Sequence, residues 1–219
     1  MPAAQLRRVY WYVVGSMDDW DLADAKAQAT LKDRFDRAKE YKAPFLADAG
    51  RKLPGEDQTK IHTEAWSMCF AAFQEWYTRK TEILDGMKRF YHGVRSSTDF
   101  IDIIECGHWK VDFFNQSVSE KGLDARLAVD MVALMASYDV AIVLSGDADS
   151  IPSIDHIKLH DKQVATVEFV GGHPPEKKGR GFSSRLKLSA DLVLRVYETE
   201  LVNSGAARKA SGDPGPVGL

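Results

Sequence analysis

The sequence lacks a surplus of positive charge, although charged residues are abundant. Its 29 lysines and arginines face 32 aspartates and glutamates, so the formal net charge is −3 and the pI is near 6.1. A protein that binds duplex nucleic acid non-specifically usually carries a basic surplus. The charge balance therefore argues against broad duplex binding. It leaves room for a local basic patch, because electrostatic steering depends on where the charges lie.

Cysteines and long apolar runs are also scarce. The two cysteines, Cys69 and Cys106, lie in no CxxC pair and near no convincing histidine ligands. We interpret them as reduced thiols that serve as small apolar side chains. No apolar run is long enough to span a bilayer, and the first eight residues lack the apolar core of a signal peptide. We therefore expect a cytoplasmic protein with no membrane partner.

Apolar runs rich in β-branched residues predict four strands. The predicted strands are Val9–Val14, Phe100–Cys106, Val140–Leu144 and Gln163–Val170. The third is short and fully apolar, which favours burial on both faces of a parallel sheet, and we place it at the centre. Helical patterns separate or follow the later strands, over Leu123–Ser137, Ile151–Leu159 and Leu186–Leu201. This alternation predicts an α/β fold in which helices cover both faces of a mainly parallel sheet, a three-layer α/β/α arrangement.

Residues 19–90 look like a helical hairpin inserted into that plan. One helix is predicted over Trp20–Tyr41, ended by Pro44, and a second over Thr59–Phe90. Together they separate the first two strands by far more than a crossover needs. We therefore predict that the hairpin lies outside the sheet core.

The second of these helices carries a wide aromatic face that includes Trp66, Phe70 and Phe73. Such a face must be covered, and packing against the first helix is the favoured interpretation. The alternatives are the interface of a homodimer and a surface that stacks RNA bases. Residues 203–219 are rich in Gly, Ala, Ser and Pro and predict a flexible tail, so residues 1–202 form the predicted domain.

Aspartates gather where this fold places its functional sites. The strand Val140–Leu144 runs directly into Ser-Gly-Asp-Ala-Asp, so Asp147 and Asp149 follow its carboxyl end, the edge at which parallel sheets bind ligands. The preceding helix runs antiparallel to the strand, which brings Asp124 at its start to the same edge. Asp130 interrupts an apolar stretch of that helix. It needs a partner there, because a lone buried charge is costly, and a metal ion would supply one.

Convergent carboxylates without histidine or cysteine favour a hard divalent cation such as Mg²⁺ or Mn²⁺. The cation relieves their mutual repulsion, and it can activate water and stabilise charge at a phosphate. Each acid also has a simpler interpretation. Asp124 can cap its helix, Asp147 and Asp149 can be turn or cap residues, and Asp130 can pair with a lysine or arginine.

Two stretches together resemble a family signature. A Lys-Gly-Leu-Asp helix start followed by Asp130 is paired with the strand that ends in Ser145-Gly-Asp-Ala-Asp149. This combination resembles the NYN branch of the PIN-like nucleases, and the similarity covers roughly residues 7–14 and 87–200. The resemblance implies a PIN-like fold and an endoribonuclease whose Mg²⁺ or Mn²⁺ ions are held by Asp124, Asp130, Asp147 and Asp149. The sequence is also similar to NYN proteins of the LabA type, some of which are tied to regulation.

One feature of that family is expected to be missing. Its members usually open with a strand ending in an aspartate, ahead of the strand that corresponds to Val9–Val14. Without that acid, we expect weak metal binding and slow or no cleavage. The alternative function is a non-catalytic regulatory or RNA-binding module. A receiver-like domain or phosphatase is less favoured, because the first strand ends Val-Val-Gly-Ser and supplies no nucleophilic aspartate.

A basic loop near the end of the domain supplies candidate RNA contacts. It contains Lys177, Lys178 and Arg180, with Arg185 and Lys187 close behind. Such side chains bind the phosphates of an RNA backbone. The alternative is a solvated turn, because a short run of charged residues usually forms an exposed turn.

Overall fold

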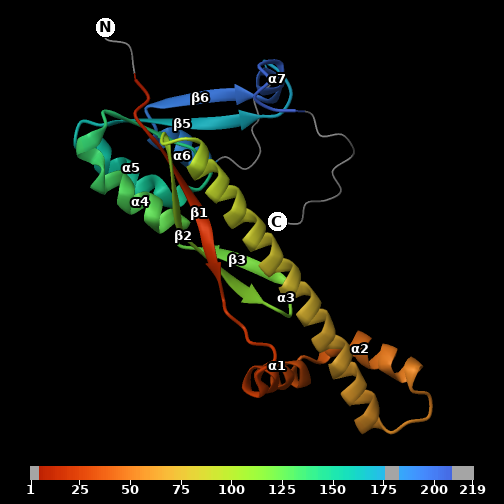
Figure 1. The fold of residues 1–219 in the computed structure, drawn as a ribbon. Coiled ribbons are helices and arrows are strands. Elements are labelled where there is room, and N and C mark those ends of the chain that lie inside the picture. The colour runs from red at the N-terminus through yellow and green to blue at the C-terminus, as the bar shows by residue number, and fades with distance from the viewer. Residues whose placement is uncertain (1–4, 176–182, 209–219) are drawn as a thin grey trace. The chain divides into compact units, whose positions relative to one another are not determined.

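The computed structural model describes residues 5–175 and 183–208. The chain divides into two compact units, Met1–Leu123 and Asp124–Leu219, and each is built on its own three-stranded sheet (Figure 1). The mixed α/β class is confirmed, whereas the single sheet predicted from the sequence is wrong. No helix among the described residues is both long and apolar enough to cross a bilayer.

The sheet of the first unit has the order β1-β2-β3. Strand β1 (Val9–Met17) is parallel to β2 (Ile101–Asp112), which is antiparallel to β3 (Ser117–Lys121). The sequence did not predict β3, because its residues are mostly polar and exposed and carry no apolar pattern. The register of β1 on β2 shifts around Gly15, where a Cβ atom would stand 2.7 Å from the Cβ of Glu105.

Three helices, rather than two, lie between β1 and β2. They are α1 (Ala25–Arg37), α2 (Lys39–Lys52) and α3 (Gln58–Ser97). Pro44 was predicted to end a helix and instead lies inside α2, which costs the helix one backbone hydrogen bond. The break falls at Ala38, whose N–H donates to the carbonyls of Arg34 and Phe35.

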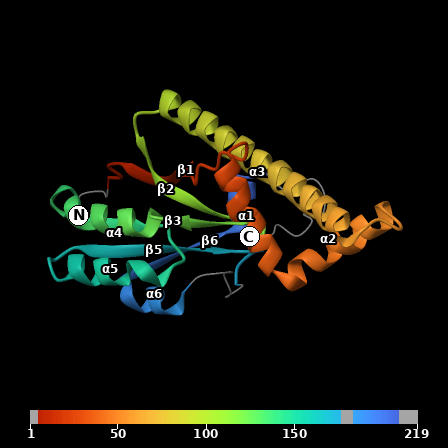
Figure 2. The same cartoon turned by 90° about the horizontal axis from the view of Figure 1, so that it is seen from below.

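The aromatic face of α3 packs against α1 and α2 and also against the turn between β2 and β3, so the predicted packing against the first helix is confirmed in part. Phe73 and Cys69 are fully buried in one core with Phe35 of α1, and the rings of Phe35 and Trp66 lie 5.5 Å apart. The last turns of α3 pack elsewhere: buried Tyr91 joins a second core on β1 and β2. The last turns of α3 therefore pack on this sheet (Figures 1 and 2), and the insertion of a separate helical hairpin stays a prediction.

The sheet of the second unit is fully parallel, with the order β4-β5-β6. Its strands are β4 (Val140–Val143), β5 (Gln163–Val170) and β6 (Leu192–Tyr197). The central strand is β5, which buries residues 164–168 without a break. The prediction that Val140–Leu144 lies at the centre is therefore wrong. Among the described residues it lies at an edge, and Ile142 is half exposed.

The region predicted as one helix over Leu186–Leu201 holds three elements. They are α6 (Ser184–Ser189), strand β6 and α7 (Glu198–Asn203). The sequence Leu-Val-Leu-Arg-Val-Tyr suits a strand because it is rich in β-branched and aromatic residues. It pairs with β5 from Ala165–Leu192 to Val170–Tyr197.

One core holds the second unit together. Buried side chains from α4 (Leu123–Ala133), α5 (Ile151–Lys158) and α6 meet Val143 and Val164 of the sheet. The strand β5 and the helix α5 follow the predicted ranges closely. The three-layer arrangement stays a prediction, and most of the predicted tail, residues 209–219, lies outside the described residues.

Candidate metal centre

The chain leaves β4 through a short turn that is fixed by hydrogen bonds. The Thr166 hydroxyl donates to the Val143 carbonyl at 3.2 Å, which ties the end of β4 to β5. The Asp147 N–H donates to the Ser145 hydroxyl at 3.2 Å. The Gly146 carbonyl accepts from the Ser183 N–H at 3.2 Å, so α6 is anchored to the same turn. This bonding fixes the backbone from which the next two aspartates project.

Asp147 and Asp149 are held by a single 3-10 turn, Ala148–Ser150, that leads into α5. The Asp147 carboxylate caps this turn, since its Oδ1 accepts from the Asp149 N–H at 3.2 Å. The buried Ser150 hydroxyl donates back to the Asp147 carbonyl at 3.2 Å. The cap uses only one carboxylate oxygen of Asp147, and both aspartates are exposed.

Asp124 comes from the first turn of α4. Two residues outside the predicted site start this helix. Gly122 has a φ of +99°, which glycine adopts without strain, and Glu120 Oε1 accepts from the Leu123 N–H at 3.1 Å. The sequence signal for this cap is a glutamate three residues ahead of an apolar helical stretch.

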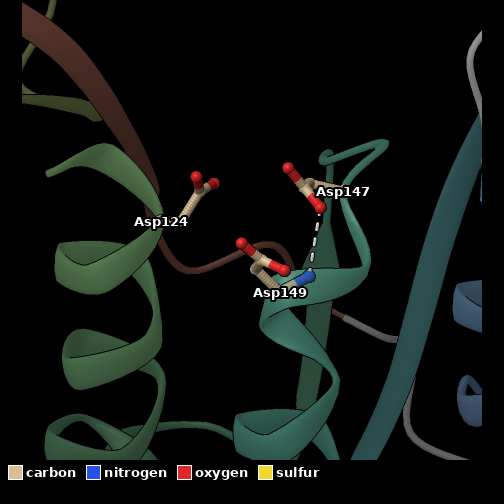
Figure 3. Close-up of side chains that lie close together, drawn as sticks. All are labelled: Asp124, Asp147 and Asp149. Carbon is tan, nitrogen blue, oxygen red and sulfur yellow. Dashed lines mark hydrogen bonds between the residues drawn. The ribbon is translucent and has the colours of Figure 1, made fainter. Parts of the chain in front are cut away.

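The three aspartates converge on one point. Each offers a carboxylate oxygen, and these oxygens lie within 4.8 Å of one another. Asp124 points from α4 toward the turn that carries Asp147 and Asp149 (Figure 3). Neither Asp147 nor Asp149 forms an ion pair with another described residue. Helix starts favour negative charge, yet three carboxylates this close still repel one another, so the donor set fits a hard divalent cation.

A family model matches the part of the chain that contains the three aspartates. The model of the NYN domain matches residues 68–192, more than half of the 219 residues. The chain belongs to the NYN family. NYN domains are part of the PIN-like nuclease superfamily, whose members typically use divalent metals. No curated protein and no solved structure matches the chain significantly.

Asp130, the fourth ligand predicted for this NYN domain, is not in the group of three. It lies on α4 and is buried, with 8% of its surface exposed. Its carboxylate accepts from Arg126 Nε at 2.9 and 3.0 Å. The buried charge thus has an arginine partner one helical turn away, the simpler of the two interpretations that the sequence allowed.

The predicted RNA contacts of the NYN domain fall into three classes. Lys177, Lys178 and Arg180 lie outside the described residues. Arg185 is exposed on α6. Lys187 is engaged inside the unit, where it pairs with Glu168, a carboxylate of β5 that is 1% exposed. Sequence patterns could not predict this pair, because the two residues lie 19 positions apart in the chain.

Proposed function

We propose that this NYN domain is a metal-dependent ribonuclease whose Mg²⁺ or Mn²⁺ ion is held by Asp124, Asp147 and Asp149. The observation that carries the proposal is the convergence of three carboxylate oxygens within 4.8 Å. Membership of a nuclease superfamily supports RNA as the substrate. Lys177, Lys178, Arg180 and Arg185 are proposed to bind the RNA backbone.

The clustered aspartates would hold and position the cation. The Oδ1 atom of Asp147 is engaged by the Asp149 N–H, which leaves Oδ2 for the cation. Asp124 is half buried and approaches from the opposite helix. A divalent ion held there would activate water and stabilise charge on the phosphate. In hydrolysis the water oxygen would form a bond to phosphorus, the phosphorus–oxygen bond to the leaving ribose would break, and the proton lost by the water would be balanced by one gained by the ribose oxygen.

A cleavage assay with paired variants tests this proposal. Asp149→Asn removes one charge from the cluster, whereas Asp155→Asn removes one exposed charge from α5. With Mn²⁺ and a labelled single-stranded RNA, Asp149→Asn should cut about 100-fold more slowly or not at all. Asp155→Asn should cut like the wild type, and chelation should stop both. Cleavage that persists in chelator or in Asp149→Asn would contradict the proposal.

The second candidate is a non-catalytic NYN module, as in regulatory members of the LabA type. It is favoured by the engagement of Asp130 with Arg126, which leaves three carboxylates for the cation instead of four. This candidate predicts RNA binding without cleavage in Mg²⁺ or Mn²⁺. The cleavage assay therefore separates the two.

A further inference from the structure

Two aromatic rings are exposed together where β1 meets the end of α3. Phe90 is 59% exposed and Trp11 is 39% exposed. Their rings lie edge to face, with centroids 6.0 Å apart. Trp11 also contacts the ring of Tyr91 at 5.8 Å, and Tyr91 is buried in the core shared by α3, β1 and β2. The packed core thus supports the exposed Trp11 ring through its contact with Tyr91.

The helix surface beside Phe90 is open. Gly86 lies four residues before Phe90 and Gly93 three residues after it, so both adjoin it on the helix. A Cβ atom at Gly93 would meet nothing within 4 Å. At Gly86 it would meet Arg89 Nη2 at 3.8 Å. The guanidinium of Arg89 therefore lies over Gly86, one turn from the Phe90 ring.

Cationic side chains also lie at this end of α3. Lys88, Arg89 and Arg95 follow one another between Asp85 and Asp99. Arg95 is engaged by Glu105 at 2.7 Å. Lys88 and Arg89 are exposed, and neither forms an ion pair within the described part of the chain. Arg89 is thus available beside the aromatic pair, whereas Lys88, two residues before Phe90, lies on another side of the helix.

We propose that Phe90 and Trp11 form a platform that stacks the bases of single-stranded RNA, with Arg89 binding an adjacent phosphate. Aromatic rings flanked by cations bind single strands in this way, whatever the base. A duplex hides its base faces, so it cannot use the platform. Two rings also offer far less area than a stable protein interface needs. The proposal rests on the proposed function only in taking RNA as the ligand.

Fluorescence anisotropy with the full chain tests the platform. The probe is a labelled single-stranded RNA of about 12 nucleotides, within the usual range for such sites, in chelator so that cleavage cannot interfere. Phe90→Ala should weaken binding about tenfold, the effect of one lost stacking contact. Phe90→Tyr should bind like the wild type, whereas Phe90→Leu should be as weak as Phe90→Ala. A merely apolar role would not separate tyrosine from leucine.

Two further variants complete the design. Phe169→Ala removes a phenylalanine of similar exposure, 52%, from the second unit, and it should leave binding unchanged. Arg89→Gln should reduce the dependence of log Kd on log salt concentration by about one unit, as expected for one lost phosphate contact. Circular dichroism and melting curves should show that all these variants fold, because Phe90 and Arg89 lie largely in solvent.

Several outcomes would overturn the platform. They are wild-type affinity in Phe90→Ala, equal binding by Phe90→Leu and Phe90→Tyr, equal loss with a duplex of the same length, and no RNA binding by the wild type. Failure of the nuclease proposal looks different. In that case binding depends on Phe90, but no cleavage depends on Asp149. Cleavage that depends on Asp149 and is indifferent to Phe90 would overturn the platform alone.

Discussion

Among the single residues, Asp124, Asp147 and Asp149 converge, whereas Asp130, on the same helix as Asp124, pairs with Arg126. Asp124, Asp147 and Asp149 follow from one rule, that the carboxyl end of a parallel strand and the start of the preceding helix share a sheet edge. Asp130 could not be placed by that rule alone. Six residues turn a helix by about 240° and advance it by about 9 Å, so Asp124 and Asp130 point in different directions. Arg126, four residues earlier on the same helix, supplies the partner that the Asp130 carboxylate needs.

The pairing of Asp130 leads to a prediction about stability. Asp130→Asn should lower the free energy of unfolding by about 1–2 kcal/mol, because it weakens a charged hydrogen bond that is mostly shielded from solvent. It should leave metal binding intact. Urea denaturation measures the first effect. Arg126→Gln should give a similar loss, and the double variant should lose less than the sum. Additive losses would mean that the two side chains do not interact.

Lys187 gives a second prediction at this scale. Lys187→Met leaves Arg195 as the partner of the buried Glu168 carboxylate at 3.2 Å. It should destabilise the protein by about 2 kcal/mol, since it removes a cation that compensates a buried charge. Arg185→Gln, on the same helix but exposed, should change stability by less than about 0.5 kcal/mol. If urea denaturation shows equal stability for both variants, the Lys187 pair is not structural.

At the scale of elements, strands with a clear apolar pattern were predicted well and the others were not. Strand β5 and helix α5 have nearly the predicted bounds, because each combines an apolar run with clear breaks at its ends. Strand β3 is polar and depends on its antiparallel partner. Strand β6 was taken for a helix, because its apolar residues also fit one helical face. Its pairing with β5 decides between the two, and local periodicity carries no information about that pairing.

Asp191 fixes the start of β6 and makes stability depend on pH. Its carboxylate accepts from the Val164 N–H at 2.8 Å and pairs with Lys158 of α5 at 2.8 Å. The hydrogen bond from Lys158, followed by that from Val164, holds the pKa of Asp191 below its usual value. A lowered folded-state pKa stabilises the protein above the unfolded-state pKa, and this contribution disappears as the pH falls through the folded-state pKa.

Asp191→Asn should therefore be less stable than the wild type at neutral pH, and the difference should shrink as the pH falls below about 4. Urea denaturation at a series of pH values measures this trend. Asp139→Asn is the matched control, because Asp139 is fully exposed and its carboxylate lies 3.8 Å from Lys162. That variant should follow the wild type at every pH. A constant difference for Asp191→Asn down to pH 2 would rule out the proposed linkage.

At the scale of the whole molecule, the sequence predicted the class of fold and its family but not the division of the sheet. The NYN model begins inside α3 and ends at the first residue of β6, so the match includes strands of both units. Each apolar stretch of the sequence predicts a strand and which of its side chains are buried. None indicates which strands share a sheet, because that depends on pairing between distant segments. One predicted sheet therefore became two.

The assignment of Asp124, Asp147 and Asp149 as a cation site can be tested by a Mn²⁺ titration of the melting temperature. A ligand that binds only the folded state raises its stability in proportion to the logarithm of concentration. Asp147→Asn keeps the shape of the turn and removes one charge from the cluster. Asp155→Asn removes an exposed charge from α5 and serves as the control.

The wild type and Asp155→Asn should gain about 5–10 °C in Tm when Mn²⁺ exceeds its Kd about 100-fold. Asp147→Asn should show no gain, and without metal it should be as stable as the wild type or slightly more so, because repulsion in the cluster is reduced. Superimposable titrations of wild type and Asp147→Asn, with no rise in either, would contradict the account. The three aspartates would then be cap and turn residues only.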